Sequence, residues 1–232
     1  MSGATGQGGE SRERELKLGV PGREVFEALI EAAGGRREPP VLQVNHFFDT
    51  AGRALRELEI GFRVREEGES FFVTVKGPTA GGGGAMLADR VELERELAPE
   101  PARVVLAGEG SPLELLEELE AGDPEASRLL AAVRKTCTGV PLAEIGAFEN
   151  ERTRVRTVLA AADVVLEFDR TCFEADELRY EVELELGPGQ SAGELGRALE
   201  ALFAEVGAGP VPTTGKLTRF LELLDGRVAP AG

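Results

Sequence analysis

The stretch RERELKL, from Arg12 to Leu18, decides the fold because charged and apolar residues alternate along it. Glu13, Glu15 and Lys17 occupy every second position, and leucines lie between and after them. Side chains of a β-strand point alternately to its two faces, so this spacing predicts a strand with one charged and one largely apolar face. Two carboxylates and an ammonium on a single face raise the question of what lies against them.

The same period of two recurs along the chain and predicts about eight strands. They cover residues 12–19, 43–49, 60–66, 71–77, 89–97, 149–159, 163–169 and 178–186. Most of them carry Glu-x-Glu or Arg-x-Arg on one face, although neighbouring like charges repel and an ordinary wetted strand face mixes in neutral residues. A barrel with the charged faces inward and the apolar faces under helices explains both sets of residues.

Helical segments with one apolar stripe are available to cover such a barrel. They are predicted at 22–33, 192–206 and 216–225, and the leucine-rich pieces 112–120 and 125–135 mark residues 100–148 as a helical insertion. We expect a single domain over residues 12–225, with a disordered tail at 1–11 and a second tail at 226–232.

Composition limits the partners and the compartment. The formal net charge of −16 argues against nucleic acid or an anionic membrane as the partner, because both would repel the chain at long range. The two cysteines are too few for a disulfide framework, and no apolar run approaches the roughly 18 residues of a membrane span. We expect a cytoplasmic protein without a signal peptide, and a homodimer formed through the 100–148 segment remains open.

The charges themselves favour one kind of ligand. Arginine binds phosphate oxygens through a planar fork, and carboxylates converging from several strands form the hard oxygen site that Mg²⁺ or Mn²⁺ prefers. A surface holding both groups suits a polyanion bound together with divalent cations. Since positioning and charge neutralisation are most of what phosphoryl transfer requires, the residues predict a metal-dependent enzyme acting on a phosphate ester or anhydride.

The chain resembles the CYTH family, also called triphosphate tunnel metalloenzymes. The resemblance begins at Glu13-x-Glu15-x-Lys17 and covers about 13–225. It continues in order through HFFDT (46–50), FRVR (62–65), TVKGP (74–78), RVELERE (90–96), ERTR (151–154), LEFDR (166–170), YEVELEL (180–186) and GKLTRF (215–220). It implies an α+β fold, an eight-stranded antiparallel β-barrel forming a tunnel with a charged interior and helices packed on the outside.

The resemblance also implies residue roles. The phosphate-binding set comprises Lys17, Arg63, Arg65, Lys76, Arg90, Arg152, Arg154 and Lys216, with Arg90 and Arg154 the weaker members. The metal-binding set comprises Glu13, Glu15, Glu94, Asp169, Glu181, Glu183 and Glu185. The resemblance leaves open which of the three glutamates of YEVELEL bind the metal. The catalytic residues implied are Lys17, Glu92 and Arg152, with Glu92 orienting a metal or water.

The implied activity is hydrolysis of a linear triphosphate, most simply inorganic triphosphate, to phosphate and pyrophosphate by two-metal attack of water on the terminal phosphorus. Two alternatives within the family are a thiamine triphosphatase and a class IV adenylyl cyclase. The chain has no tryptophan, which animal-type thiamine triphosphatases carry before the Leu-Arg-x-Arg strand, and it lacks the His-Phe-type element of the cyclases. A third alternative is a polyphosphate- or nucleotide-binding module without turnover.

Overall fold

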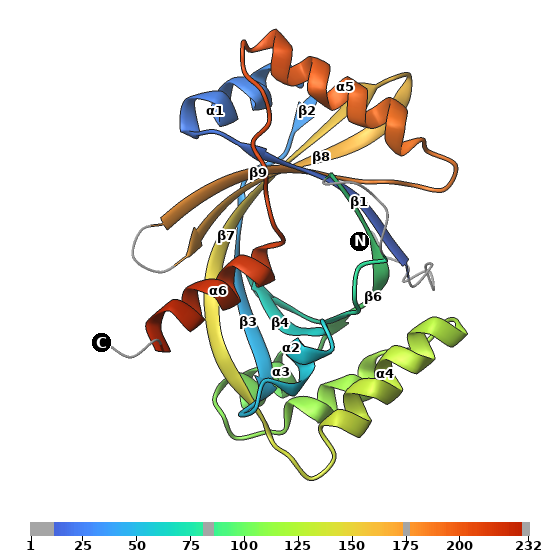
Figure 1. The fold of residues 1–232 in the computed structure, drawn as a ribbon, viewed down its shortest axis with the longest axis vertical. Coiled ribbons are helices and arrows are strands. Elements are labelled where there is room, and N and C mark those ends of the chain that lie inside the picture. Colours follow the sequence, from blue (N-terminus) through green and yellow to red (C-terminus); the bar gives the residue numbers. More distant parts are fainter. Residues whose placement is uncertain (1–11, 81–85, 174–176, 229–232) are drawn as a thin grey trace. The chain divides into compact units, whose positions relative to one another are not determined.

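The computed structural model describes residues 12–80, 86–173 and 177–228. The strands are β1 (Arg12–Val20), β2 (Arg36–Arg37), β3 (Val41–Thr50), β4 (Gly61–Glu67), β5 (Ser70–Lys76), β6 (Leu87–Leu97), β7 (Leu142–Leu159), β8 (Ala162–Phe173) and β9 (Glu177–Glu185). The helices are α1 (Arg23–Ala32), α2 (Ala54–Glu57), α3 (Pro99–Leu106), the 3-10 helix η1 (Pro112–Glu118), α4 (Pro124–Thr136), α5 (Ala192–Glu205) and α6 (Lys216–Val228) (Figure 1).

The strands pair in the order β2-β7-β3-β4-β5-β6-β1-β9-β8, and β8 pairs back to β7. Over the described residues this ring of hydrogen bonds is a closed eight-stranded antiparallel β-barrel, to which the short strand β2 is added along β7. The predicted α+β fold class is confirmed. The boundaries of the single predicted domain, 12–225 with its two tails, stay a prediction, and residues 1–11 lie outside the described part.

Contacts divide the chain into two compact units. The first unit takes the described parts of residues 1–13, 45–81 and 89–147. The second takes those of residues 14–44, 82–88 and 148–232.

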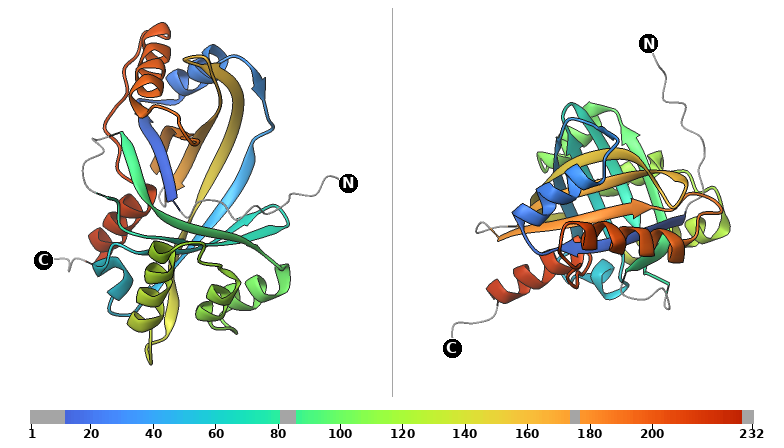
Figure 2. Two further views of the ribbon diagram at one scale, coloured as in Figure 1. Left: turned by 90° about the vertical axis from the view of Figure 1, so that its right-hand side faces the viewer. Right: turned by 90° about the horizontal axis from the view of Figure 1, so that it is seen from above.

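In the first unit, helices cover the apolar faces of β4, β5 and β6. Val64, Val73 and Val75 on these strands are fully buried, and Leu116 of η1 and Val133 of α4 belong to the same core. Figure 2 shows the green and yellow-green helices of residues 99–136 gathered on one side of these strands. Burial of the valines removes one strand face from water and leaves the charged face as the other face of the sheet.

Helix α2 was not predicted because a side chain outside it organises its first turn. The buried carboxylate of Asp49 accepts hydrogen bonds from the backbone N–H groups of Leu55 at 2.9 Å and Arg56 at 3.1 Å. These are among the first N–H groups of a helix, which have no partner inside the helix. Asp49, at the end of β3, therefore caps a four-residue helix too short to show a period.

In the second unit, α1 and α5 cover the apolar faces of β1, β8 and β9 (Figure 1). Leu166, Phe168 and Leu184 on the strands are fully buried, as is Leu199 of α5. Helix α5 begins at a side-chain cap, because Ser191 Oγ accepts a hydrogen bond from the Glu194 N–H at 3.3 Å. The amphipathic helices predicted at 22–33 and 192–206 therefore serve the purpose inferred for them.

Strands β7 and β2 depart from the sequence prediction. Strand β7 begins at Leu142 and not at residue 149, so the helical part of the 100–148 segment ends with α4 at Thr136. Gly139, with a left-handed φ of 72°, and Pro141, two residues later, end the helical stretch, so the residues from Leu142 onward can extend as a strand. The pair Arg36–Arg37 forms β2, which is too short and too polar to be recognised by alternation.

Candidate functional site

Strand β1 supplies charged side chains to two clusters, one in each unit. The first charged cluster comprises Glu13 of β1, Arg63 and Arg65 of β4, Lys76 of β5, and Arg90, Glu92 and Glu94 of β6. The second charged cluster comprises Glu15 and Lys17 of β1, Arg152 and Arg154 of β7, Glu167 and Asp169 of β8, Glu181 and Glu183 of β9, and Lys216 of α6. Period-two alternation places these residues on the face of each strand opposite the helices.

In the first charged cluster, Glu13 is held between two cations. Lys76 Nζ lies 3.0 Å from Glu13 Oε1, and Arg90 Nε donates to Glu13 Oε2 at 2.6 Å. Burial raises the pKa of Glu13, but the charges of Lys76 and Arg90 outweigh burial and hold the pKa below its ordinary value. Glu13 is therefore an ionised carboxylate in a largely dry environment.

Glu92 lies in the same cluster, but its pKa is shifted in the opposite direction to that of Glu13. Its Oε2 atom lies 2.6 Å from Lys76 Nζ, although the geometry is not that of a hydrogen bond. Burial and the neighbouring Glu13 carboxylate raise the pKa of Glu92, against the lowering effect of Lys76. The pKa values of the two neighbouring carboxyl groups are therefore shifted in opposite directions, a pattern that acid–base sites also show.

Glu94 brings the two arginines of β4 together. Arg65 Nη2 donates to Glu94 Oε1 at 3.0 Å, and Arg63 Nη2 lies 3.2 Å from Glu94 Oε2. Thr74 Oγ1 donates to the same oxygen at 2.8 Å, and the Arg65 guanidinium lies over the Phe72 ring at 4.6 Å. Burial raises the pKa of Glu94, and the charges of Arg63 and Arg65 more than offset it, so the pKa is lowered.

In the second charged cluster, three carboxylates surround one ammonium. Lys216 Nζ, at the first residue of α6, lies 2.7 Å from Asp169 Oδ2 and 3.0 Å from Glu181 Oε2, and it also donates to Glu183 Oε1. Thr213, three residues before Lys216, donates its hydroxyl to Glu181. The first turn of α6 and the loop before it thus place a cation among acids from β8 and β9.

Arg152 binds the same acids from β7. Its Nη2 atom donates to Asp169 Oδ2 at 2.6 Å and to Glu183 Oε2 at 2.7 Å, and its Nη1 atom donates to Glu167. Asp169 has no solvent exposure. Burial raises the pKa of Asp169, but the charges of Arg152 and Lys216 lower it further than burial raises it.

Lys17 completes this cluster. Its Nζ atom lies 2.7 Å from Glu183 Oε1 and 3.1 Å from Glu15 Oε1. Burial lowers the pKa of Lys17, whereas the Glu15 and Glu183 carboxylates raise it above the ordinary value, so Lys17 stays an ammonium. The pKa of Glu183 is lowered, because the charges of Lys17 and Lys216 outweigh the effect of burial.

The donor set fits magnesium or manganese in kind, since it consists of carboxylate oxygens. Asp169, Glu181 and Glu183 already converge on one cationic atom, the Lys216 ammonium. Within residues 12–80, 86–173 and 177–228, no group of three or more His, Cys, Asp or Glu side chains is arranged as a metal site. A divalent ion would therefore compete with the bound lysine and arginine for these oxygens.

The structure brings the other predicted site residues into the two clusters and places Glu185 at the edge of the second. Glu185 ends β9, faces Glu15 across the strand pair and is exposed to solvent. The prediction omitted Glu167 and Thr213. Glu167 shares the strand face of Asp169 two residues away, a signal that could have identified it, whereas the contact of Thr213 depends on where its loop lies.

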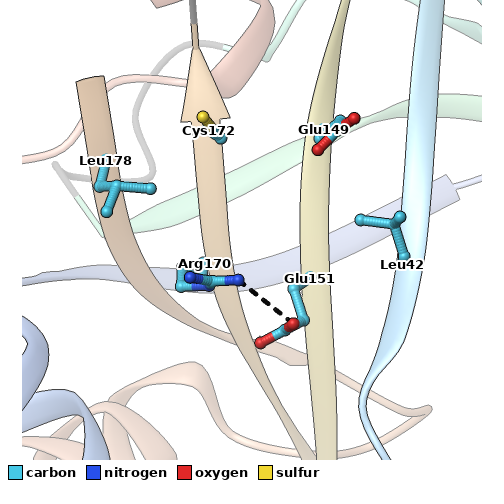
Figure 3. A pocket seen from close by; sticks show the side chains of 6 residues that line it. All are labelled: Leu42, Glu149, Glu151, Arg170, Cys172 and Leu178. Carbon is cyan, nitrogen blue, oxygen red and sulfur yellow. Dashed lines mark hydrogen bonds and ion pairs between the residues drawn. The ribbon is translucent and has the colours of Figure 1, made fainter. Parts of the chain in front are cut away.

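A separate pocket of 300 Å³ lies in the second unit (Figure 3). Its walls include Leu42, Glu149, Cys172 and Leu178, together with the Arg170–Glu151 pair at 3.3 Å. None of these residues belongs to either charged cluster. We therefore assign it no part in the predicted chemistry.

The family model described as the CYTH domain matches residues 11–214. A Hippeastrum protein described as a candidate adenylyl cyclase with a dominant triphosphatase activity superposes with a TM-score of 0.75 at 24% identity, over 90% of this chain and 95% of that one.

Two further solved structures share the fold. A Bacillus halodurans protein described as a candidate adenylate cyclase has a TM-score of 0.60 at 23% identity, over 91% of this chain and 99% of that one. A Pyrococcus horikoshii protein has a TM-score of 0.52 at 18% identity, over 93% and 99%. No curated protein matches the sequence. Among the described helices, none is long and apolar enough to cross a bilayer.

Proposed function

The chain belongs to the CYTH domain family, and from this premise we propose that it hydrolyses a linear triphosphate, most simply inorganic triphosphate, to phosphate and pyrophosphate in the presence of Mg²⁺ or Mn²⁺. The observation that carries the proposal is the burial of Asp169, Glu181 and Glu183 around Lys216. Burying these charges costs folding free energy, whereas apolar residues at the same positions would not carry that cost. Binding of a ligand is therefore the simplest reason for charged residues at these positions.

The cations would bind the triphosphate. Arg63, Arg65 and Lys76 of the first cluster, and Lys17, Arg152 and Lys216 of the second, now pair with carboxylates and would exchange these partners for phosphate oxygens. Arg152 would use the same two-pronged fork that now holds Asp169. Arg90 and Arg154 would be secondary contacts. As charge grows on the leaving pyrophosphate, these fixed cations stabilise it.

The carboxylates released from their lysines and arginines would hold the metal. Glu13 and Glu15 are proposed for one ion, and Asp169, Glu181 and Glu183 for another. Glu94, behind Glu92, and the exposed Glu185 are the weaker candidates for metal ligands. A bound divalent ion would supply charge neutralisation and a more acidic water. Glu92, which lies beside Lys76, is proposed to orient a metal or the attacking water.

A substrate panel tests the proposal. Inorganic triphosphate, ATP and thiamine triphosphate are each incubated with Mg²⁺ and Mn²⁺, and phosphate, pyrophosphate and cyclic nucleotide are measured separately. We expect phosphate and pyrophosphate in equal amounts from triphosphate. Cyclic AMP as the main product would favour the cyclase alternative, which the descriptions of two fold neighbours make worth testing. Binding without any product would favour the non-catalytic module.

A further inference from the structure

A row of arginines on β7 runs from the buried second cluster toward solvent. Arg152, Arg154 and Arg156 occupy alternate positions of one strand face, and their side chains are 13%, 29% and 56% exposed. At about 3.3 Å per residue, the row is roughly 13 Å long. Arg36 of β2 lies directly opposite Arg156 in the strand register and extends the row sideways on the same face.

The carboxylates of this face stop before the arginines do. Asp169 of β8 lies opposite Arg152, and Glu167 lies opposite Arg154, but the residue of β8 opposite Arg156 is Val165. Glu38 is the single acid that the described residues place against the outer pair, with its Oε1 atom 2.8 Å from Arg156 Nε. No described residue forms an ion pair with the exposed side chain of Arg36. The outer end of the row therefore carries excess positive charge.

Such an arrangement is costly without a ligand, since like charges placed opposite each other on paired strands are destabilising. It is also local, because the molecule as a whole has a net charge of −16. A phosphate chain is the ligand whose chemistry matches a linear row of guanidinium groups spaced along one direction. An anion bound by Arg152 and Arg154 would reach Arg156 and Arg36 only if it extended beyond the triphosphate proposed as substrate.

We propose that Arg36 and Arg156 form an outer subsite for a linear polyphosphate longer than three phosphates. Through this subsite the protein discriminates between polyphosphates of different length. This inference rests on the proposed function for the role of Arg152 and Arg154 as phosphate contacts. The outer pair binds the phosphates that extend beyond the triphosphate and takes no part in bond cleavage. Its removal should weaken binding of long chains and leave binding of triphosphate almost unchanged.

The test measures binding without turnover. Wild type and the double variant Arg36→Gln/Arg156→Gln are titrated calorimetrically, in EDTA, with inorganic triphosphate and with linear polyphosphate of a defined greater length. We expect the double variant to lose about tenfold in affinity for the long chain, as the loss of exposed charge-assisted contacts would give, and less than about twofold for triphosphate. Arg37→Gln is the matched control, an exposed arginine on the same strand whose side chain points to the other face.

Two results would overturn the inference: equal loss of affinity for both ligands in the double variant, or the same loss in Arg37→Gln. Thermal unfolding verifies that each variant is folded, and Arg36→Lys/Arg156→Lys should recover part of the long-chain affinity because it restores the charge without the fork. Phosphate release from triphosphate with Mg²⁺ is measured on the same proteins. Absence of release with retained length preference contradicts the proposed function alone, whereas full release without length preference contradicts this inference alone.

Discussion

Arg152 and Asp169 lie directly opposite each other on β7 and β8 and share a two-pronged contact, from Nε to Oδ1 at 2.7 Å and from Nη2 to Oδ2 at 2.6 Å. Asp169 is completely buried, so its charge is compensated only by groups of the protein. The residue proposed to bind phosphate is therefore also the one that stabilises a proposed metal ligand. Substrate binding and fold stability are coupled at this pair.

The coupling predicts that Arg152→Gln lowers the free energy of unfolding by about 3 kcal/mol, because it leaves a buried carboxylate without its fork. Urea denaturation measures the change. Adding Asp169→Asn to the same protein should recover part of the loss, since the stranded charge is then gone. Arg170→Gln is the control, because its pair with Glu151 is about 40% exposed on both sides and should be worth less than about 1 kcal/mol. A smaller effect at Arg152 than at Arg170 would contradict the prediction.

Glu92→Gln should stabilise the metal-free protein at neutral pH while reducing turnover. Burial and Glu13 raise the pKa of Glu92 in the folded state, so the carboxyl contributes stability at pH values below its unfolded pKa and loses that contribution as pH rises through the folded pKa. Replacing it by a neutral amide removes this loss, and we expect a gain of about 1 kcal/mol, or roughly 2–4 °C in Tm. Glu94→Gln is the matched comparison.

Glu94→Gln should destabilise the protein, because the pKa of Glu94 is lowered by Arg63 and Arg65, which would lose their shared partner. Thermal unfolding at pH 7 in EDTA compares the two variants. Shifts of the same sign in the Glu92 and Glu94 variants would contradict the opposite pKa shifts of the two carboxyl groups.

Acid should destabilise the metal-free protein, because several of its carboxylates have lowered pKa values in the folded state. The pKa values of Glu13, Glu94, Asp169 and Glu183 are lowered in the folded state, so their contribution to stability is complete above the unfolded values, about 3.9 for Asp and 4.3 for Glu, and is lost as pH falls below them. The urea midpoint measured from pH 7 to pH 3 should fall steeply at the acidic end. Asp169→Asn should flatten that fall, and an unchanged slope would argue against the assigned charge state.

Gly19→Ala should disturb Lys216 from a distance. A Cβ atom at Gly19 would lie 2.7 Å from the carbonyl oxygen of Val211, which pairs with Gly19 and precedes α6. We expect the loop to shift, with a loss of about 1–3 kcal/mol of stability and weaker binding of triphosphate measured by calorimetry. Gly22→Ala is the control, since nothing lies within 4 Å of an added Cβ there and its φ of 171° is ordinary extended backbone. Equal binding by both variants would contradict the proposed link.

Much of the fold could be predicted because alternation is a local signal. The spacing of Glu13, Glu15 and Lys17 fixes which side chains share a face, and the apolar residues between them require helices as cover. The strand β2 and the helix α2 were not predicted, because each forms only with a partner elsewhere in the chain. Arg36–Arg37 pairs with β7, and Asp49 caps α2. Two to four residues carry no readable period.

The site was predictable in type but not in pairing. Alternation shows which charged residues share a strand face. It does not show that Lys216 approaches Asp169 or that Glu185, at the end of its strand, is exposed to solvent. Those outcomes depend on where α6 begins and where β9 stops. Glu167 was on the identified face, and its contact with Arg152 needed the strand register to be seen.

The proposed triphosphatase activity is measured as phosphate release from inorganic triphosphate by wild type and by Glu13→Gln, with Mg²⁺ or Mn²⁺ and then with EDTA. We predict one phosphate and one pyrophosphate per triphosphate in wild type, no release in EDTA, and a loss of at least about a hundredfold in Glu13→Gln, equivalent to about 2.7 kcal/mol of transition-state stabilisation. Phosphate release that persists in EDTA, or near-full activity in both Glu13→Gln and Glu15→Gln, would contradict the proposed metal-dependent hydrolysis.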